Sequence, residues 1–131
     1  MIYLDSNVFI YASVNTQEAG EKARSLLLRI QRGDEKAQTS ALTFDEVFWA
    51  IKKLDFEAAL EACQALLNFP NLEIIPTDRD LAISALQIIK QYHLAPREAI
   101  HAATAIAAKA ETLISTDPHF DNIKELRRKS L

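Results

Sequence analysis

Four acidic residues, far apart in the sequence, stand at positions from which they could act on one substrate. Asp5 and Asp117 each follow a short apolar run that is typical of a buried strand. Glu46 stands a few residues beyond a third such run, and Glu98 lies near the start of the helix predicted for PREAIHAATA. That helix is apolar around most of its circumference and should be largely buried, where an ionised carboxylate needs a partner. Glu98 is therefore expected either at an exposed helix start or beside a cation.

The four acids would need a cation in order to share one site, because neighbouring carboxylates repel and raise one another's pKa. Mg²⁺ and Mn²⁺ remove this conflict, since they prefer carboxylate, water and phosphate oxygens as ligands. Such a site can polarise a phosphodiester and lower the pKa of a bound water. Four acids without a cluster of cysteine or histidine therefore indicate an Mg²⁺- or Mn²⁺-dependent phosphodiesterase.

Each acid also has a purely structural explanation. Asp5 and Asp117 could be N-caps, because a short acid accepts backbone N–H bonds at a helix start. The segment from Thr43 to Glu46 fits the capping-box pattern. Glu98 suits the helix dipole near its N-terminus. The case for chemistry therefore depends on whether the fold brings the four residues together.

The elements that must position these acids alternate between short apolar runs and helical periodicity. Strands are expected at Ile2–Leu4, Ala37–Thr39, Leu72–Ile75 and Thr112–Ser115. Helices are expected at Thr16–Arg32, Thr43–Lys53, Phe56–Asn68, Asp78–Tyr92 and Arg97–Lys109. The basic tail, Asn122–Leu131, is predicted to hold either a final short strand or a frayed helix. This alternation predicts an α/β fold around a mainly parallel sheet of four to five strands.

A parallel sheet would gather the acids, because the carboxyl ends of its strands meet at one edge, where ligands bind. Asp5, Glu46 and Asp117 are expected at that edge. Glu98 joins them if its helix begins above the same edge.

Composition limits the alternatives. The 131 residues are 49% hydrophobic, and we expect one domain over residues 1–131. The net charge of -3 argues against nucleic-acid binding by charge alone. The single cysteine, Cys63, excludes an intramolecular disulfide and a multi-cysteine zinc site, and two glycines are too few for glycine-rich phosphate loops. With no signal-peptide pattern or membrane span, a soluble cytoplasmic protein is expected.

Four segments together resemble the PIN-domain ribonucleases, in the style of the toxins of VapC-type toxin–antitoxin pairs. The segments are MIYLDSNVFIYA, SALTFDEVFWA, PREAIHAATA and LISTDPHFDNI, and they occur in the family's order along essentially the whole chain. The resemblance implies a three-layer α/β/α sandwich and RNA cleavage that uses Mg²⁺ or Mn²⁺ held by acids. It implies that the protein is an endoribonuclease that hydrolyses phosphodiester bonds.

The resemblance also assigns residues. It implies catalytic roles for Asp5, Glu46, Glu98 and Asp117. Of these, Asp5, Glu98 and Asp117 would hold metal, and Asp121 matches a further acid present in many members. Asn7 and Thr116 match polar positions that often accompany the acids. Glu98 stands where the family usually has aspartate.

Other side chains are weighed on their own chemistry. His101, one turn after Glu98, is interpreted as a packed helix residue rather than a ligand, because a hard Mg²⁺ or Mn²⁺ site prefers oxygen. His93 and His119 receive no role. Arg97, beside Glu98, is the best candidate for a phosphate contact. Further candidate cations are Lys52, Lys53 and the cluster Arg127–Lys129.

Partners and competing functions follow from the same residues. Expected partners are an RNA substrate, an antitoxin protein and a second copy of the chain, with exposed apolar surface on helices 43–68 available to a protein partner. A phosphatase acting through an aspartyl phosphate is disfavoured, since the acid needed two residues after Asp5 is replaced by the amide Asn7. A non-catalytic PIN-like scaffold that binds RNA or protein is the main alternative.

Overall fold

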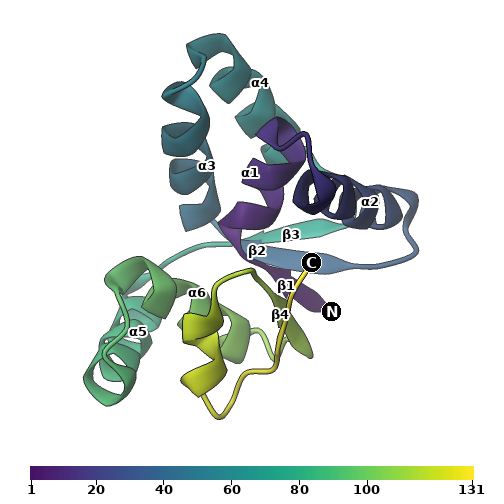
Figure 1. Cartoon of the computed structure of the whole chain (residues 1–131). Coiled ribbons are helices and arrows are strands. Elements are labelled where there is room, and N and C mark those ends of the chain that lie inside the picture. The colour runs from purple at the N-terminus through teal and green to yellow at the C-terminus, as the bar shows by residue number, and fades with distance from the viewer.

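A five-stranded parallel sheet lies between two layers of helices (Figure 1). The computed structural model describes all residues from 1 to 131. The strand order is β3-β2-β1-β4-β5, and every neighbouring pair is parallel. The strands are β1 (Ile2–Leu4), β2 (Ala37–Ser40), β3 (Leu72–Ile75), β4 (Thr112–Ile114) and β5 (Arg128–Lys129). The predicted α/β fold is confirmed, and the tail forms the short strand rather than the frayed helix.

Six α-helices and one 3₁₀ helix connect the strands. They are α1 (Ser6–Val14), α2 (Glu18–Arg32), α3 (Leu42–Lys52), α4 (Phe56–Leu67), α5 (Arg79–Tyr92), α6 (Pro96–Ala107) and η1 (Pro118–Asn122). The five expected helices are present, with ends that differ by one or two residues. Helix α1 was not among them, because its segment SNVFIYASV is apolar without helical periodicity. No helix combines the length and the apolar character that crossing a membrane requires.

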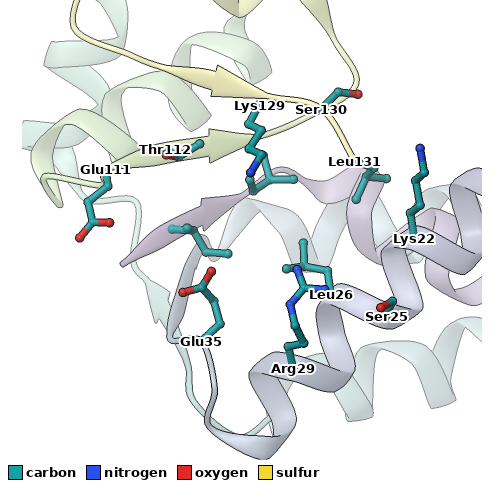
Figure 2. A pocket seen from close by; sticks show the side chains of 12 residues that line it. Lys22, Ser25, Leu26, Arg29, Glu35, Glu111, Thr112, Lys129, Ser130 and Leu131 are labelled. Carbon is teal, nitrogen blue, oxygen red and sulfur yellow. The ribbon is translucent and has the colours of Figure 1, made fainter.

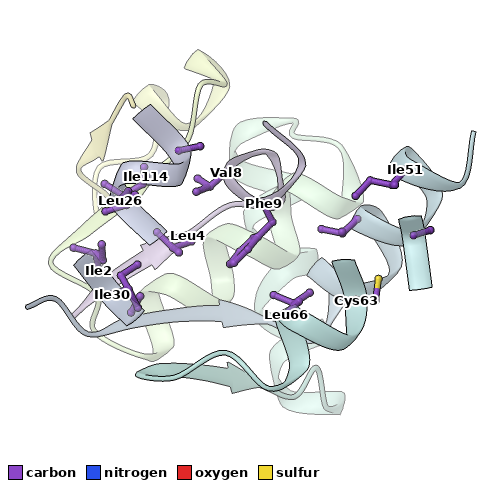
Figure 3. Packing of buried hydrophobic residues seen from close by; sticks show 14 residues of the cluster. Ile2, Leu4, Val8, Phe9, Leu26, Ile30, Ile51, Cys63, Leu66 and Ile114 are labelled. Atoms are coloured by element: carbon purple, nitrogen blue, oxygen red, sulfur yellow. The ribbon is translucent and has the colours of Figure 1, made fainter. Parts of the chain in front are cut away.

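Two hydrophobic cores lie on opposite faces of the sheet. On β1, Ile2 and Leu4 point into the core beneath α1, α2, α3 and α4 (Figure 3). Tyr3, between them, points into the second core, which α5, α6 and η1 close. This alternation is the period of two that a strand imposes. It makes β1 the central strand of the sandwich and places Asp5 where both layers meet the sheet edge.

Helix α6 approaches the sheet closely because its inner surface is built from small side chains. Ala99, Ala102, Ala103 and Ala105 are buried there. His101 is buried among them, with 2% of its surface exposed. The alanines of PREAIHAATA therefore serve packing, and they bring the first turn of α6 to the edge where the acids lie.

An exposed N-cap offers a local test of the fold. The side chain of Asp55 accepts hydrogen bonds from the backbone N–H groups of Glu57 and Ala58 at the start of α4. Asp55→Ala should lower the free energy of unfolding by about 1 kcal/mol, because it leaves these donors without their partner. Urea denaturation measures the loss. Glu61→Ala, on an exposed position of the same helix, is the matched control and should change stability by under about 0.5 kcal/mol.

Candidate active site

Asp5 lies at the buried end of the site. Its Oδ1 accepts a hydrogen bond from the backbone N–H of Ser6 at 2.7 Å, and its Oδ2 accepts one from the Ser115 hydroxyl at 2.7 Å. The strand register explains the second contact. Leu4 pairs with Ile114, so the residues that follow these two strands, Asp5 and Ser115, lie side by side. Both oxygens of Asp5 are therefore held in a fixed orientation.

Ser115 connects the acids that follow two neighbouring strands. Its Oγ donates to Asp5 and accepts a hydrogen bond from the backbone N–H of Asp117 at 3.0 Å. Because Ser115 is fully buried, its hydroxyl has little freedom to choose other partners. A single side chain thus fixes the positions of Asp5 and Asp117 relative to each other.

Asp5, Glu46 and His101 form the inner cluster, which has ligand atoms close enough to hold a metal ion. The Nε2 atom of His101 lies 2.5 Å from Oε1 of Glu46 and 3.5 Å from Oδ1 of Asp5. On the other side of the ring, Nδ1 lies 2.7 Å from the Tyr3 hydroxyl. The imidazole therefore lies between the acids and a buried phenol.

Glu98, Asp117 and His119 form the outer cluster, nearer to solvent. Nδ1 of His119 lies 2.7 Å from Oε2 of Glu98 and 3.3 Å from Oδ1 of Asp117. The other oxygen of Glu98 accepts the backbone N–H of Ala95 and so caps α6. Exposure of the carboxylate side chains increases outward, from 10% at Asp5 to 29% at Asp117.

The electrostatics of the outer cluster favour negative charge on Asp117. Burial raises the pKa of Asp117, but other contacts outweigh it and the pKa lies below its ordinary value. These contacts are with the Glu98 side chain and the backbone N–H of His119, together with the positive charges of His119 and Arg128. Basic groups therefore already reduce the repulsion among the acids in the metal-free protein.

For three of the acids, the capping interpretation and the clustering interpretation both apply. Asp5, Glu98 and Asp117 each accept a backbone N–H at a helix start, yet each also belongs to a cluster. The capping box predicted for Glu46 is wrong: α3 begins at Leu42, after Ala41, and the Ser40 hydroxyl accepts its first backbone N–H at 3.0 Å. The Thr43 hydroxyl is instead hydrogen-bonded to Thr39. Glu46 is left free to meet His101.

The other candidate residues lie around the clusters with partners of their own. Asp121 makes a two-pronged ion pair with Arg128, whose guanidinium also donates to the backbone oxygen of Ser115. These hydrogen bonds hold the pKa of Asp121 below its ordinary value. Asn7 donates to the Thr116 hydroxyl at 2.9 Å. Arg97 is 62% exposed and lies 3.9 Å from Asp45.

His119 is the site residue to which the sequence analysis assigned no role. Its only local signal is its place between Asp117 and Asp121 in a segment that matched the family. The hydrogen bond to Glu98 raises the pKa of His119, and the charges of Asp117 and Glu98 raise it further.

The raised pKa of His119 gives a pH prediction. The ion pair with Glu98 and Asp117 is complete below the ordinary value of 6.5 and is lost as the pH rises through the raised pKa. An NMR titration of the His119 ring should give a midpoint above 6.5 in the metal-free protein. In Glu98→Gln the midpoint should move down, since the largest cause of the shift is removed. An unchanged midpoint in that variant would contradict the assigned pairing.

The donor set suits a hard divalent cation. The carboxylates of Asp5, Glu98 and Asp117 offer oxygen ligands of the kind that Mg²⁺ and Mn²⁺ prefer. Asn7 adds an Oδ1 atom that is buried and has no hydrogen-bond partner. Glu46 could contribute its second oxygen, because only Oε1 contacts His101. Each cluster brings two of these carboxylates together, and the donor types present fit such an ion.

A pocket of about 440 Å³ lies away from these acids (Figure 2). It is bounded by α2, by Ile2 of β1, by the two ends of β4 and by the C-terminal residues, and Arg29, Glu35 and Lys129 are among its lining side chains. None of the four acids lines it. The chemistry-bearing residues lie instead at the carboxyl edge of the sheet, where the parallel topology places them.

Comparisons with solved structures give the same architecture. The VapBC2 complex of Rickettsia felis, bound to a promoter DNA fragment, has 21% identity, covers 99% of this chain and 98% of its own, and has a TM-score of 0.75. VapC20 of Mycobacterium tuberculosis, a toxin that cleaves the sarcin–ricin loop, has 14% identity, with 97% and 99% covered and a TM-score of 0.78. DNA-bound VapBC of Salmonella typhimurium has 20% identity, with 98% and 96% covered and a TM-score of 0.75.

Sequence comparison identifies the family directly. No match was found among the curated proteins. The PIN domain family, however, matches residues 2–126 and so includes all four acids and the whole of both clusters. With its parallel five-stranded sheet and its acids at the carboxyl edge, the protein belongs to the PIN domain family.

Proposed function

We propose that the protein is an endoribonuclease that hydrolyses RNA phosphodiester bonds with Mg²⁺ or Mn²⁺ bound to its acidic residues. The observation that carries this proposal is the junction of the two clusters. Ser115 bonds Asp5 of the inner cluster and the backbone of Asp117 of the outer one. Helix α6 contributes His101 to the first cluster and Glu98 to the second. Acids from four separate segments are thereby held at one edge.

In this proposal Asp5, Glu98 and Asp117 hold the metal, and Glu46 completes the catalytic acids. When bound, the cation polarises the phosphodiester and lowers the pKa of the attacking water. The chain's own contribution is to hold the carboxylates ready. Asp5 is fixed by two hydrogen bonds, so little reorganisation is needed when charge develops in the substrate.

Asp121 enters the proposal through Arg128. Its two oxygens are paired with the guanidinium, which also donates to the Ser115 backbone at 3.0 Å. The positive charge of Arg128 acts on Asp117. We propose that Asp121 supports the metal-binding acids by positioning this arginine, and that it could ligate metal only if the ion pair opened.

The substrate contacts are proposed for residues at the rim. Arg97 is exposed, and its only ion pair, with Asp45, is long, so its guanidinium is available for a phosphate. Asn7 and Thr116, hydrogen-bonded to each other, lie one or two residues from Asp5 and Asp117. They would contact the nucleotide beside the cleaved bond. RNA as the substrate class is supported by VapC20, a protein of similar fold that cleaves the sarcin–ricin loop.

Metal removal tests the proposal. The purified protein should cleave a labelled RNA with Mn²⁺ or Mg²⁺ present, and excess EDTA should remove the activity completely. Adding back Mn²⁺ should restore it. The measurement is the rate of product formation on a denaturing gel, with RNA but no protein as the control. Cleavage that persists in EDTA would contradict the proposed chemistry.

An antitoxin is the proposed protein partner, and the protein is proposed to act as the toxin of such a pair. Support comes from the similar structures of VapBC complexes and from an apolar face on α3 and α4, which lie side by side (Figure 1). Phe44, Trp49, Phe56 and Leu60 are each at least 40% exposed on these helices. An apolar face of this kind suits a partner helix or a second copy of the chain.

A further inference from the structure

His101 is a deeply buried imidazole at the site, and both of its ring nitrogens are occupied. Nδ1 contacts the Tyr3 hydroxyl, and Nε2 contacts Oε1 of Glu46. Only 2% of the His101 side chain is exposed, and Tyr3 is fully buried. The ring of Tyr3 also meets the imidazole edge to face, with centroids 5.8 Å apart. The imidazole is therefore fixed both by packing and by two hydrogen bonds.

The chemistry of the partners determines which nitrogen carries the proton. An ionised carboxylate can only accept hydrogen bonds, so Nε2 must donate to Glu46. The Tyr3 phenol is fully buried and, like other phenols, is protonated at neutral pH, so it has a proton that it can donate. Nδ1 then accepts from Tyr3. One chain of donors runs from Tyr3 through His101 to Glu46.

We propose that His101 is a positioning residue and not a metal ligand: Tyr3 holds its imidazole in the Nε2–H tautomer, and that N–H holds Glu46 beside Asp5. The part of this inference that concerns metal rests on the proposed function. The Nε2–H group also faces Oδ1 of Asp5 at 3.5 Å, so a single donor partly offsets the repulsion between two carboxylates.

Metal ligation by His101 would undo this arrangement. A ligating Nε2 cannot carry a proton, so the hydrogen bond to Glu46 would break and the one to Tyr3 would have to reverse. The Tyr3 contact thus favours the acids, and not the imidazole, as the ligands.

Two measurements test the inference, and the first needs no metal. In ¹⁵N NMR of the metal-free protein, His101 should show a protonated Nε2 and a bare Nδ1. Tyr3→Phe removes only the hydroxyl that donates to Nδ1. In this variant Nε2 should stay protonated, because Glu46 still accepts from it, and the Nδ1 resonance should move toward that of a nitrogen without a hydrogen bond. A wild-type ring protonated at Nδ1 and bare at Nε2 would overturn the proposal, whether or not the protein cleaves RNA.

The second measurement is Mn²⁺ affinity, by calorimetry, with EPR on the same samples. His101→Gln keeps an N–H near the position of Nε2 and should bind Mn²⁺ within about threefold of wild type, whereas His101→Leu should bind it about 10- to 100-fold more weakly. Thermal unfolding checks that each variant is folded. Unchanged Mn²⁺ affinity in folded His101→Leu would overturn the positioning role. So would ¹⁴N coupling to Mn²⁺ in the EPR spectrum of wild type that is absent from that of His101→Gln. A wild-type protein that binds no Mn²⁺ would instead refute the proposed function, and the tautomer would still decide the role of His101.

Discussion

Asp5→Asn should lower Mn²⁺-dependent RNA cleavage by at least about 100-fold while leaving the protein folded. The substitution removes the negative charge at the centre of the site but keeps the size of the side chain. Its remaining oxygen can accept the Ser6 N–H, and its amide can donate to Ser115, which already accepts from Asp117. Only the buried Ser115 hydroxyl loses its acceptor, at a cost of about 1 to 3 kcal/mol, so the variant should stay folded and the loss of cleavage should come from chemistry.

The midpoint of thermal unfolding should show whether Asp5→Asn loses activity without losing stability. Asp5→Asn relieves repulsion between Asp5 and Glu46 in the metal-free protein, which offsets part of the lost Ser115 hydrogen bond, so its midpoint should stay close to that of wild type. Added Mn²⁺ should raise the midpoint of wild type but not that of the variant. Asp34→Asn, an exposed acid in the loop before β2, is the matched control and should behave as wild type in both assays. Wild-type cleavage by Asp5→Asn would overturn the assignment of the site.

The Glu98 variants should separate charge from geometry. Glu98→Gln should lower cleavage at saturating Mn²⁺ by at least about 100-fold, because an amide cannot supply the ligand charge. It should leave α6 intact, since the glutamine oxygen can still accept the Ala95 N–H. Glu98→Asp keeps the charge, one methylene nearer to the backbone, and should stay within about tenfold of wild type. Single-turnover cleavage rates measure the three proteins.

The same series tests the non-catalytic alternative. If wild type, Glu98→Asp and Glu98→Gln all fail to cut but still bind RNA in a fluorescence anisotropy assay, the protein is a PIN scaffold. In the metal-free structure His119 pairs with both Glu98 and Asp117, and metal must displace that pairing or share it. Activity in Glu98→Asp alone would mean that the longer glutamate favours the histidine over the metal.

The arrangement of the sheet could be predicted from the sequence because it depends on local patterns. Short apolar runs alternate with helical periodicity, and that order requires parallel strands with helical crossovers. The position of Asp5 after β1 and of Asp117 after β4 then follows from topology alone, since parallel strands end at the same edge. The segment of α1 escaped prediction because its apolar residues lack a helical period, and its place against α2 and α3 makes it a helix.

Hydrogen-bond partners, by contrast, depend on contacts between distant segments. The pairs Tyr3–His101, His101–Glu46 and Asp121–Arg128 each form only when separate elements meet. Sequence patterns indicate the face of a helix or strand on which a residue lies. They do not indicate which donor comes within hydrogen-bond distance of which acceptor, because that depends on positions to a fraction of an ångström. His119, whose local pattern indicated no role, thus contacts both acids of the outer cluster. Asp121, an expected metal ligand, is paired with Arg128.

By itself, the sequence determined the α/β class, the edge at which the acids meet and the hard-oxygen character of the site, because these follow from periodicity and residue chemistry. Only the tertiary structure decided which carboxylates are free, which are capped or paired, and which side chains the buried histidine contacts. Those choices depend on the register of β1 against β4 and on the depth at which α6 packs. Both are set by side-chain packing across the whole chain.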